Sequence, residues 1–277
     1  MRGIDLTVEK DKVLEVENLN VWYRSGALTK QRTHVLHDVS FTIGRGEILG
    51  LVGESGSGKT VTAMVISSLM PENKATVTGQ VLLDGEDLLA LDENAMRQKQ
   101  GSDISVVFQE PMTAMNPVMR IGPQVEESLR VHTTLSKEER RERALQALRD
   151  VDLSNVEELY NKYPHQLSGG MLQRVMIAAA IVSEPKLLLA DEPTTALDVT
   201  IQAQILELLQ RLNRERGMSI LFISHNLNVV RKLCSRVAVM EKGLIVEQGD
   251  TEQVFRNPQA PYTQRLIAAI PTRKKLW

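Results

Sequence analysis

The sequence has little cysteine, almost no net charge and no long apolar run. Cys234 is the one cysteine, so no disulfide can form within the chain, and no Cys/His cluster has the spacing of zinc ligands. The 33 basic and 35 acidic side chains nearly cancel, which leaves no overall attraction for nucleic acid. The longest apolar run, Val175 to Val182, falls far short of the roughly 20 residues that span a bilayer. We therefore expect a protein of a reducing compartment that does not cross a membrane alone.

Length and composition are those of an ordinary soluble protein. At 277 residues the chain can form one large domain, or a domain with an appendage, and bury a substantial core. Its 42% hydrophobic and 25% charged residues exclude the disordered and fibrous classes. Residues 1–12 carry three acidic side chains and no apolar segment, unlike a secretory signal. These features predict a chain that stays in the cytosol.

Short apolar runs between glycine, proline and polar turns predict strands in the first part of the chain. The run Glu47–Val52 is bounded by glycines, as expected for a buried parallel strand. A helix is expected over Val61–Met70, before Pro71, and the polar stretch 24–33 is expected to form a loop. The other predicted strands are Leu14–Tyr23, Val35–Ile43, Ala75–Leu83, which ends at the turn Asp84-Gly85, and Ile104–Phe108.

The middle of the chain differs, because residues 111–164 contain no convincing strand. Lys137–Val151 predicts a charged amphipathic helix, and the region as a whole predicts a helical insertion. Alternation of strands and helices then returns, which favours a mainly parallel sheet. The predicted elements are helices Met171–Val182 and Val199–Arg216, strands Leu187–Ala190 and Ser219–Ile223, and a hairpin of Arg236–Met240 with Leu244–Gln248.

A glycine-rich stretch joins the predicted strand at Glu47–Val52 to the helix that follows it. It satisfies G-x-x-x-x-G-K-[ST] between a buried strand and a helix, the context in which this pattern binds nucleotide phosphates. The glycines let backbone N–H groups turn toward phosphate oxygens, Lys59 reaches the β- and γ-phosphates, and Thr60 can coordinate Mg²⁺. The alternative is a flexible turn. The residues of this phosphate loop are Gly53, Glu54, Ser55, Gly56, Ser57, Gly58, Lys59 and Thr60.

Two adjacent acids, Asp191 and Glu192, follow the apolar run Leu187–Ala190. The carboxyl end of a strand is where open α/β sheets bind ligands. Because neighbouring side chains point in different directions, Asp191 can serve the Mg²⁺ sphere while Glu192 faces the γ-phosphate, where a water could attack. The alternative is a pair of acids that merely caps the next turn.

A serine and two glycines stand at the start of another predicted helix, in Leu167–Gly170. Backbone N–H groups at a helix N-terminus favour an anion, and serine is also a common helix cap. Taken alone, Ser168 would be an ordinary cap. Its position between the other two motifs makes the pattern specific.

These motifs resemble the ATP-binding cassette (ABC) ATPases, and the resemblance covers nearly the whole chain. It is carried, in the family's order, by Gly53–Thr60, Gln109, Leu167–Gly170, Leu187–Glu192, Ala196-Leu197-Asp198 and His225. The resemblance implies a P-loop NTPase core with a mainly parallel sheet, an N-terminal antiparallel β subdomain and an inserted α-helical subdomain. We expect one ABC ATPase domain over residues 1–277, with the insertion near 110–166, the signature helix from 168, and an importer-type tail over 250–277.

The family resemblance also implies residue roles. It implies a head-to-tail dimer in which the signature residues of one subunit contact the ATP held by the other; these residues are Ser168, Gly169, Gly170 and, in the D-loop, Asp198. Gln109 matches the glutamine that links metal and water to the helical insertion, and His225 matches the histidine that contacts the γ-phosphate. Glu192, His225 and Gln109 are the expected catalytic residues, and Thr60, Gln109 and Asp191 the expected Mg²⁺ ligands. Tyr23 stands where an aromatic ring usually stacks on adenine, although Trp22 is adjacent.

Two stretches resemble the oligopeptide, dipeptide and nickel importer branch: residues 108–117 and the tail Asn257–Thr263. That resemblance implies an ATPase on the cytoplasmic face of the membrane, with two transmembrane permease subunits, a second ATPase subunit and an extracytoplasmic binding protein. Met112, Met115 and Val118 would offer apolar contacts to a permease helix, or belong to the helical core. Many peptide-importing relatives bind an iron–sulfur cluster through extra cysteines, which are absent here, so neither that cluster nor zinc is expected.

Several alternatives remain at this point. The cargo is a peptide, nickel or a metal chelate, and the second ATPase is an identical or a homologous chain. The rival function is a soluble ABC ATPase that acts on nucleic acid or ribosomes. Such relatives usually carry a long coiled-coil insertion, zinc-binding cysteines or tandem cassettes, none of which this sequence shows, so no nucleic acid partner is expected.

Overall fold

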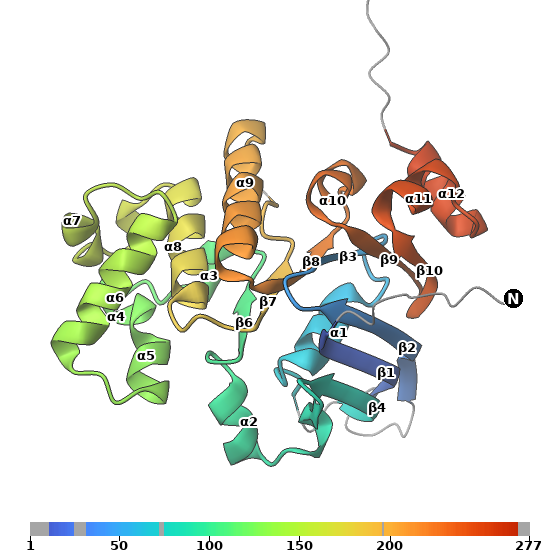
Figure 1. Cartoon of the computed structure of the whole chain (residues 1–277), viewed down its shortest axis with the longest axis horizontal. Coiled ribbons are helices and arrows are strands. Elements are labelled where there is room, and N and C mark those ends of the chain that lie inside the picture. Colours follow the sequence, from blue (N-terminus) through green and yellow to red (C-terminus); the bar gives the residue numbers. More distant parts are fainter. Residues whose placement is uncertain (1–10, 25–31, 72–74, 196, 271–277) are drawn as a thin grey trace, which may run out of the picture.

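The computed structural model describes residues 11–24, 32–71, 75–195 and 197–270, and it contains two sheets and a group of helices (Figure 1). The smaller sheet is antiparallel, with the order β2-β1-β4-β5. Its strands are β1 (Lys12–Arg24), β2 (Arg32–Gly44), β4 (Ala75–Leu83) and β5 (Glu86–Asp87). This sheet is the predicted N-terminal antiparallel β subdomain, and both halves of the turn between β4 and β5, Asp84 and Gly85, have positive φ as a tight hairpin requires.

The larger sheet has six strands in the order β10-β9-β3-β8-β7-β6. All neighbouring strands run parallel except β10, which pairs antiparallel with β9 at the edge. The strands are β3 (Ile48–Val52), β6 (Ile104–Val107), β7 (Leu187–Asp191), β8 (Ser219–Ser224), β9 (Arg236–Glu241) and β10 (Leu244–Asp250). The prediction of a mainly parallel sheet is therefore confirmed, and every residue of β3, β7 and β8 is buried, as their unbroken apolar runs indicated.

The helices between β6 and β7 gather on one side of the molecule (Figure 1), where the sequence predicts a helical insertion near 110–166 followed by the signature helix. They are α3 (Pro111–Ala114), α4 (Ile121–Val125), α5 (Glu127–His132), α6 (Lys137–Asp150), α7 (Val156–Tyr160), a 3-10 turn (Pro164–Gln166) and α8 (Gly169–Ile181). The remaining helices are α1 (Lys59–Ile66), a 3-10 turn (Leu88–Ala90), α2 (Glu93–Lys99), α9 (Val199–Arg216), α10 (Leu227–Leu233), α11 (Thr251–Arg256) and α12 (Pro261–Ala268).

Two apolar cores lie on the two faces of the larger sheet. One joins the helical insertion and α9 to side chains such as Val107, Leu188 and Phe222. The other joins α1 and the antiparallel sheet to the opposite face, through side chains such as Leu49, Leu189 and Leu221. Because alternate residues of one buried strand serve the two cores, the sheet is the rigid element against which both subdomains pack.

Several boundaries differ from the sequence predictions, most of them by one to three residues, and two differences are instructive. Helix α1 ends at Ile66 rather than Met70, because Ser68 takes a left-handed conformation with φ of 52° that ends the helical turn. The polar stretch 24–33 is shorter than predicted, since Arg24 belongs to β1 and Arg32 begins β2; residues 25–31 lie outside the described part of the chain. The short helices α2, α10, α11 and α12 were not predicted.

Candidate nucleotide-binding site

The phosphate loop leaves the carboxyl end of β3, in the middle of the larger sheet, and leads into α1. At two positions of the loop, close contacts leave no room for a side chain. A Cβ at Gly53 would lie 2.1 Å from the carbonyl oxygen of Met240, and a Cβ at Gly58, where φ is +112°, would lie 2.6 Å from Leu36. Only glycine allows the loop to curl this tightly at these two positions.

A cavity of about 760 Å³ opens over this loop. It brings together residues that are far apart in the sequence but lie at the carboxyl ends of neighbouring parallel strands. Its lining residues are Val35, Gly53, Glu54, Ser55, Gly56, Gly58, Lys59, Thr60, Val61, Gln109, Glu192, Thr195, His225 and Leu266. Most of the predicted nucleotide-binding residues and all three predicted catalytic residues therefore face one space.

Lys59 is folded back against the loop that carries it. Its Nζ donates to the carbonyl oxygens of Gly53 at 2.8 Å and Glu54 at 2.9 Å, and the residue is only 5% exposed. Burial lowers the pKa of Lys59, although the charges of Glu192 and Asp191 act to raise it. The ammonium group is thus placed over the loop, where an anionic ligand would relieve the cost of its burial.

Glu192 lies at the centre of a hydrogen-bonded group. Its Oε1 lies 2.9 Å from Nδ1 of His225, and its Oε2 accepts from the Thr195 hydroxyl at 2.9 Å and from Nε2 of Gln109 at 3.4 Å. Burial acts to raise the pKa of Glu192, but the hydrogen bonds from His225 and Thr195 outweigh it and the pKa is lowered. The backbone at Glu192 is left-handed, with φ of 47°, an unusual conformation for a residue other than glycine.

Asp191 is buried at the end of β7, and its Oδ1 has no hydrogen-bond partner among the described residues. Burial raises the pKa of Asp191, and a hydrogen bond from Thr60 acts to lower it. A buried carboxylate oxygen without a partner is costly unless a ligand occupies it. The oxygen atoms of Asp191, Thr60 and the Gln109 amide are the donors that Mg²⁺ prefers, so these residues fit the predicted metal.

The residues predicted to act across a dimer lie elsewhere. Ser168 caps α8 by accepting from the Met171 N–H, Asp198 caps α9 in the same way, and both are exposed. Gly169 and Gly170, in the first turn of α8, are also absent from the cavity lining, and Ala196 lies outside the described residues. Within one chain, therefore, the signature motif does not reach the phosphate loop.

Tyr23 is likewise not brought to the cavity. Its hydroxyl donates to the Met70 sulfur at 3.4 Å, beyond the end of α1, and the ring packs against the apolar core of the antiparallel sheet. Trp22 points the other way and stacks on His34, with ring centroids 4.4 Å apart. The adenine-stacking role of Tyr23 thus has no support from its position.

Other residues of the site were missed at the level of sequence. Thr195 supports Glu192, and Leu266 of α12 lines the cavity. The tail residue Tyr262 accepts a hydrogen bond from the Glu54 backbone N–H at 3.0 Å. The sequence pattern marked Tyr262 only as part of a branch-specific motif, and gave no signal that it touches the phosphate loop.

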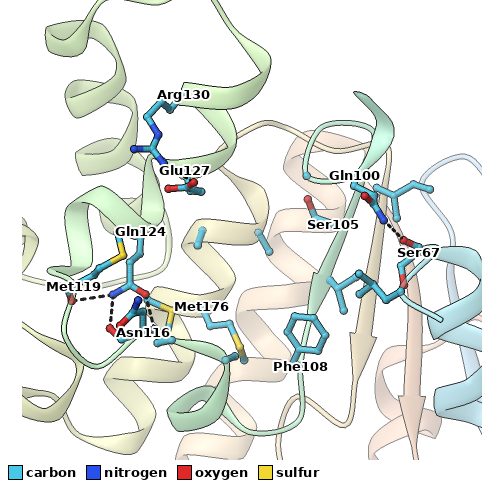
Figure 2. Close-up of a pocket in the computed structure, with 18 residues that line it drawn as sticks. Ser67, Gln100, Ser105, Phe108, Asn116, Met119, Gln124, Glu127, Arg130 and Met176 are labelled. Carbon is cyan, nitrogen blue, oxygen red and sulfur yellow. Dashed lines mark hydrogen bonds and ion pairs between the residues drawn. The ribbon is translucent and has the colours of Figure 1, made fainter. Parts of the chain in front are cut away.

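A second cavity, of about 540 Å³, lies between the start of β6 and the helical insertion (Figure 2). The Gln124 side chain donates to the backbone oxygens of Asn116 at 3.0 Å and Met119 at 2.9 Å, which fixes the segment between α3 and α4 along one wall. Phe108 stands on the opposite wall and is 44% exposed. This interdomain groove, lined by Phe108, Ala114, Met115, Met119 and Met176 among others, is largely apolar.

The family follows from comparison with known proteins. A family model described as "ABC transporter" matches residues 36–195, more than half of the 277 residues. The chain belongs to the ABC transporter family. A second family model, "Oligopeptide/dipeptide transporter, C-terminal region", matches residues 246–277 of this ABC ATPase, the region of the predicted importer-type tail.

The names of similar proteins support this assignment. The peptidoglycan transport ATP-binding protein YejF of Agrobacterium fabrum is 50% identical over 260 residues, which cover 94% of this ABC chain and 47% of that protein. The chain therefore spans about half the length of this relative. A protein of Brucella abortus is 46% identical over 270 residues, 95% of this chain and 79% of its own length, and its name assigns it provisionally to peptide import.

A solved structure agrees with the fold. The ATP-binding cassette MJ0796, determined as a dimer in a post-hydrolysis state with ADP and Pi, aligns with a TM-score of 0.76 at 31% identity, over 86% of this chain and 98% of that one. The predicted fold class and ABC ATPase activity are confirmed, and the matches favour the transporter over the nucleic acid alternative. In the described part of this ABC chain, no helix has the length and apolarity to cross a bilayer.

Proposed function

We propose that this ABC ATPase is the energy-supplying subunit of an importer, in which ATP binding and hydrolysis drive peptide transport across the cell membrane. The observation that carries the proposal is the single cavity where the phosphate loop meets the Glu192–His225 pair. Binding and hydrolysis of one phosphate chain would need these two groups on opposite sides of the γ-phosphate, and their shared cavity supports such an arrangement.

The chemistry follows from the geometry. The loop N–H groups and Lys59 hold the phosphates, and Asp191, Thr60 and Gln109 hold Mg²⁺, which would neutralise charge on the β- and γ-phosphates. The ionised Glu192 accepts a proton from a water as the water oxygen bonds to the γ-phosphorus and the bond to the β-phosphate oxygen breaks. ADP and phosphate are the products. His225, beside Glu192, faces the same phosphate.

A dimer completes the site in this proposal. The exposed Ser168 and Gly169 and the partly buried Gly170, at the start of α8, would contact the γ-phosphate of a partner ATPase, and Asp198 would lie across the same interface. Val199, next to Asp198, is 82% exposed, an unusual position for a valine unless a partner covers it. The proposal leaves open whether the partner is an identical or a homologous chain, and whether both sites hydrolyse ATP.

The interdomain groove is the proposed contact with two transmembrane permease subunits. Two apolar side chains beside the groove are exposed: Met112 is 58% exposed and Val118 is 81% exposed. Both residues lie between prolines, on the short segment around α3. An apolar groove with adaptable methionines suits an amphipathic helix. Gln109 precedes this segment directly, so a movement at the γ-phosphate would pass from Gln109 to the permease contact.

Cargo and location are further parts of the proposal. The match of residues 246–277 to an oligopeptide/dipeptide tail, and the relatives named for peptide import or peptidoglycan transport, support a peptide cargo over nickel or a metal chelate. An importer of this kind would need an extracytoplasmic binding protein. The ATPase would then lie on the cytoplasmic face of the membrane, held there by the permeases.

The test is affinity purification of the full chain from detergent-solubilised membranes of its own host, in the presence of Mg²⁺ and ATP. We expect two permease subunits to co-purify with the wild-type chain, and most of this recovery to be lost with Val118→Asp, because a carboxylate would have to be desolvated in the apolar contact. Substitution at this exposed position should leave folding and basal ATP hydrolysis unchanged.

Leu244→Asp is the matched control, since Leu244 is an exposed apolar residue on β10, far from the groove (Figure 1). It should retain the permeases. Recovery of ribosomes or nucleic acid without a membrane subunit would contradict the importer, and equal recovery with Val118→Asp would remove the groove as the docking surface.

A further inference from the structure

The C-terminal tail touches the phosphate loop directly. The hydroxyl oxygen of Tyr262, in the first turn of α12, accepts the backbone N–H of Glu54 at 3.0 Å, and Tyr262 is only 6% exposed. One helical turn later, Leu266 lines the nucleotide cavity. A segment that marks a branch of the family therefore forms one wall of the site common to the whole family.

Glu54 links Tyr262 to Lys59. The Glu54 N–H is held by Tyr262, and the Glu54 carbonyl oxygen accepts from Nζ of Lys59 at 2.9 Å. The backbone of Glu54 is therefore fixed from both ends. The Glu54 carbonyl oxygen also accepts the Ser57 N–H at 3.2 Å. Without Tyr262, the Glu54 N–H would lose its partner, and the peptide whose carbonyl Lys59 contacts would be held from the carbonyl side only.

Tyr262 is itself held firmly. Glu247 on β10 accepts from the backbone N–H groups of Gln259 at 2.8 Å and Ala260 at 3.0 Å, which pins the chain just before α12. Arg265 lies 5.9 Å from the centre of the Tyr262 ring. Burial raises the pKa of Tyr262, so its hydroxyl stays neutral and can accept the Glu54 N–H throughout the physiological range.

We propose that Tyr262 is a positioning residue of the nucleotide site, which holds Glu54 so that Lys59 and the loop N–H groups are preset for the phosphates of ATP. The tail thereby sets the affinity for ATP without touching the reacting atoms. This inference rests on the proposed binding of ATP at the phosphate loop. A preset loop binds more tightly because less conformational freedom is lost when the ligand arrives.

The test is Tyr262→Phe in the full chain, which keeps the ring and its packing but removes the acceptor. We expect the Kd for ATP, measured by titration calorimetry with Mg²⁺, to rise about 2- to 10-fold, the range that one net hydrogen bond allows. The KM for ATP should rise by the same factor while kcat stays constant, since the contact is equally present in the ground and transition states. A merely structural role would lower the melting temperature and leave the Kd of the folded protein unchanged.

A second variant tests the connection through the tail. Glu247→Ala frees the segment before α12 and should raise the Kd by a similar factor, and the double variant with Tyr262→Phe should bind no more weakly than the weaker single variant. Additive effects would overturn the proposal. The matched control is Tyr160→Phe, which removes a tyrosine hydroxyl bonded to Glu126 in the helical insertion and should leave the Kd unchanged.

The two proposals fail in different ways. A wild-type chain that does not bind ATP would contradict the proposed function. A wild-type chain that binds ATP, with Tyr262→Phe binding it equally well, would overturn only the role of Tyr262.

Discussion

At the scale of single residues, Glu192 shows how neighbours decide the charge of a proposed catalytic group. Burial alone would raise its pKa and favour the protonated form, which could not accept a proton from water. His225 and Thr195 reverse this, because both form short contacts with the ionised oxygens. Thr195 therefore helps to keep the Glu192 carboxylate ionised.

We predict that Thr195→Val will move the acid limb of the pH profile of kcat/KM for ATP to higher pH. The sign follows from the hydrogen bond: the Thr195 hydroxyl lowers the pKa of Glu192, so its removal raises the pKa and protonates the carboxylate earlier as the pH falls. Steady-state hydrolysis from mildly acidic to neutral pH measures the shift. Thr78→Val, at an exposed position of β4, is the control, and an unmoved acid limb in Thr195→Val would contradict the support of Glu192 by Thr195.

At the scale of helices and strands, long periodic segments were predictable from the sequence and short ones were not. Helix α9 was predicted with its bounds because its apolar residues recur at helical spacing and Gly217 ends it with a left-handed backbone. The unpredicted helices α10 and α11 have seven and six residues, too few to show a period. Their existence depends on tertiary packing rather than on a local pattern.

The residues of the site could likewise be predicted only in part from the sequence. The phosphate loop and the strand-end acids are contiguous in the sequence, so their chemistry could be recognised before the fold was known. The contacts of Thr195 and Tyr262 could not be recognised from the sequence. The Thr195 contact depends on the left-handed backbone at Glu192, and the Tyr262 contact joins residues 208 positions apart. The contacts of Tyr23 also depend on the fold, which turns its ring toward Met70.

Helix α6 is stabilised by its own first turn, and this leads to a prediction at the same scale. Ser136 accepts the Glu139 N–H at 3.2 Å, while the Glu139 side chain accepts the Ser136 N–H at 2.7 Å. Ser136→Ala should destabilise the protein by about 1 kcal/mol, the usual cost of losing a cap, as measured by urea unfolding. Ser154→Ala, at an exposed serine between α6 and α7, should change stability little; an equal loss in both variants would argue against the cap.

At the scale of the whole molecule, the proposed ATP site needs residues from two chains. The phosphate loop faces its own cavity, and the signature serine at the start of α8 is exposed outside it. A second ATPase subunit in the opposite orientation would bring one half against the other. Dimerisation and ATP binding would then be thermodynamically coupled, because ATP would form part of the interface.

We predict that Glu192→Gln will lower turnover by about 100-fold or more, because glutamine cannot accept the proton, while ATP still binds. The uncleaved ATP should then hold two subunits together, which size-exclusion chromatography with light scattering would detect as about twice 31.0 kDa. Glu215→Gln, at an exposed residue of α9, should behave as wild type. Normal turnover in Glu192→Gln would contradict the role of Glu192, and lost turnover in a monomer would assign the second position to a homologous chain.

The position of β3 between β8 and β9 has a consequence for biosynthesis. Both neighbours of this strand, and the tyrosine that contacts the loop after it, come much later in the chain. At about 5–20 residues per second, a ribosome needs roughly 10 to 40 s to translate the 208 positions from Glu54 to Tyr262. For most of that interval this apolar strand has neither edge paired, because β8 begins only at Ser219, so the nascent chain depends on chaperones or on temporary contacts to avoid aggregation.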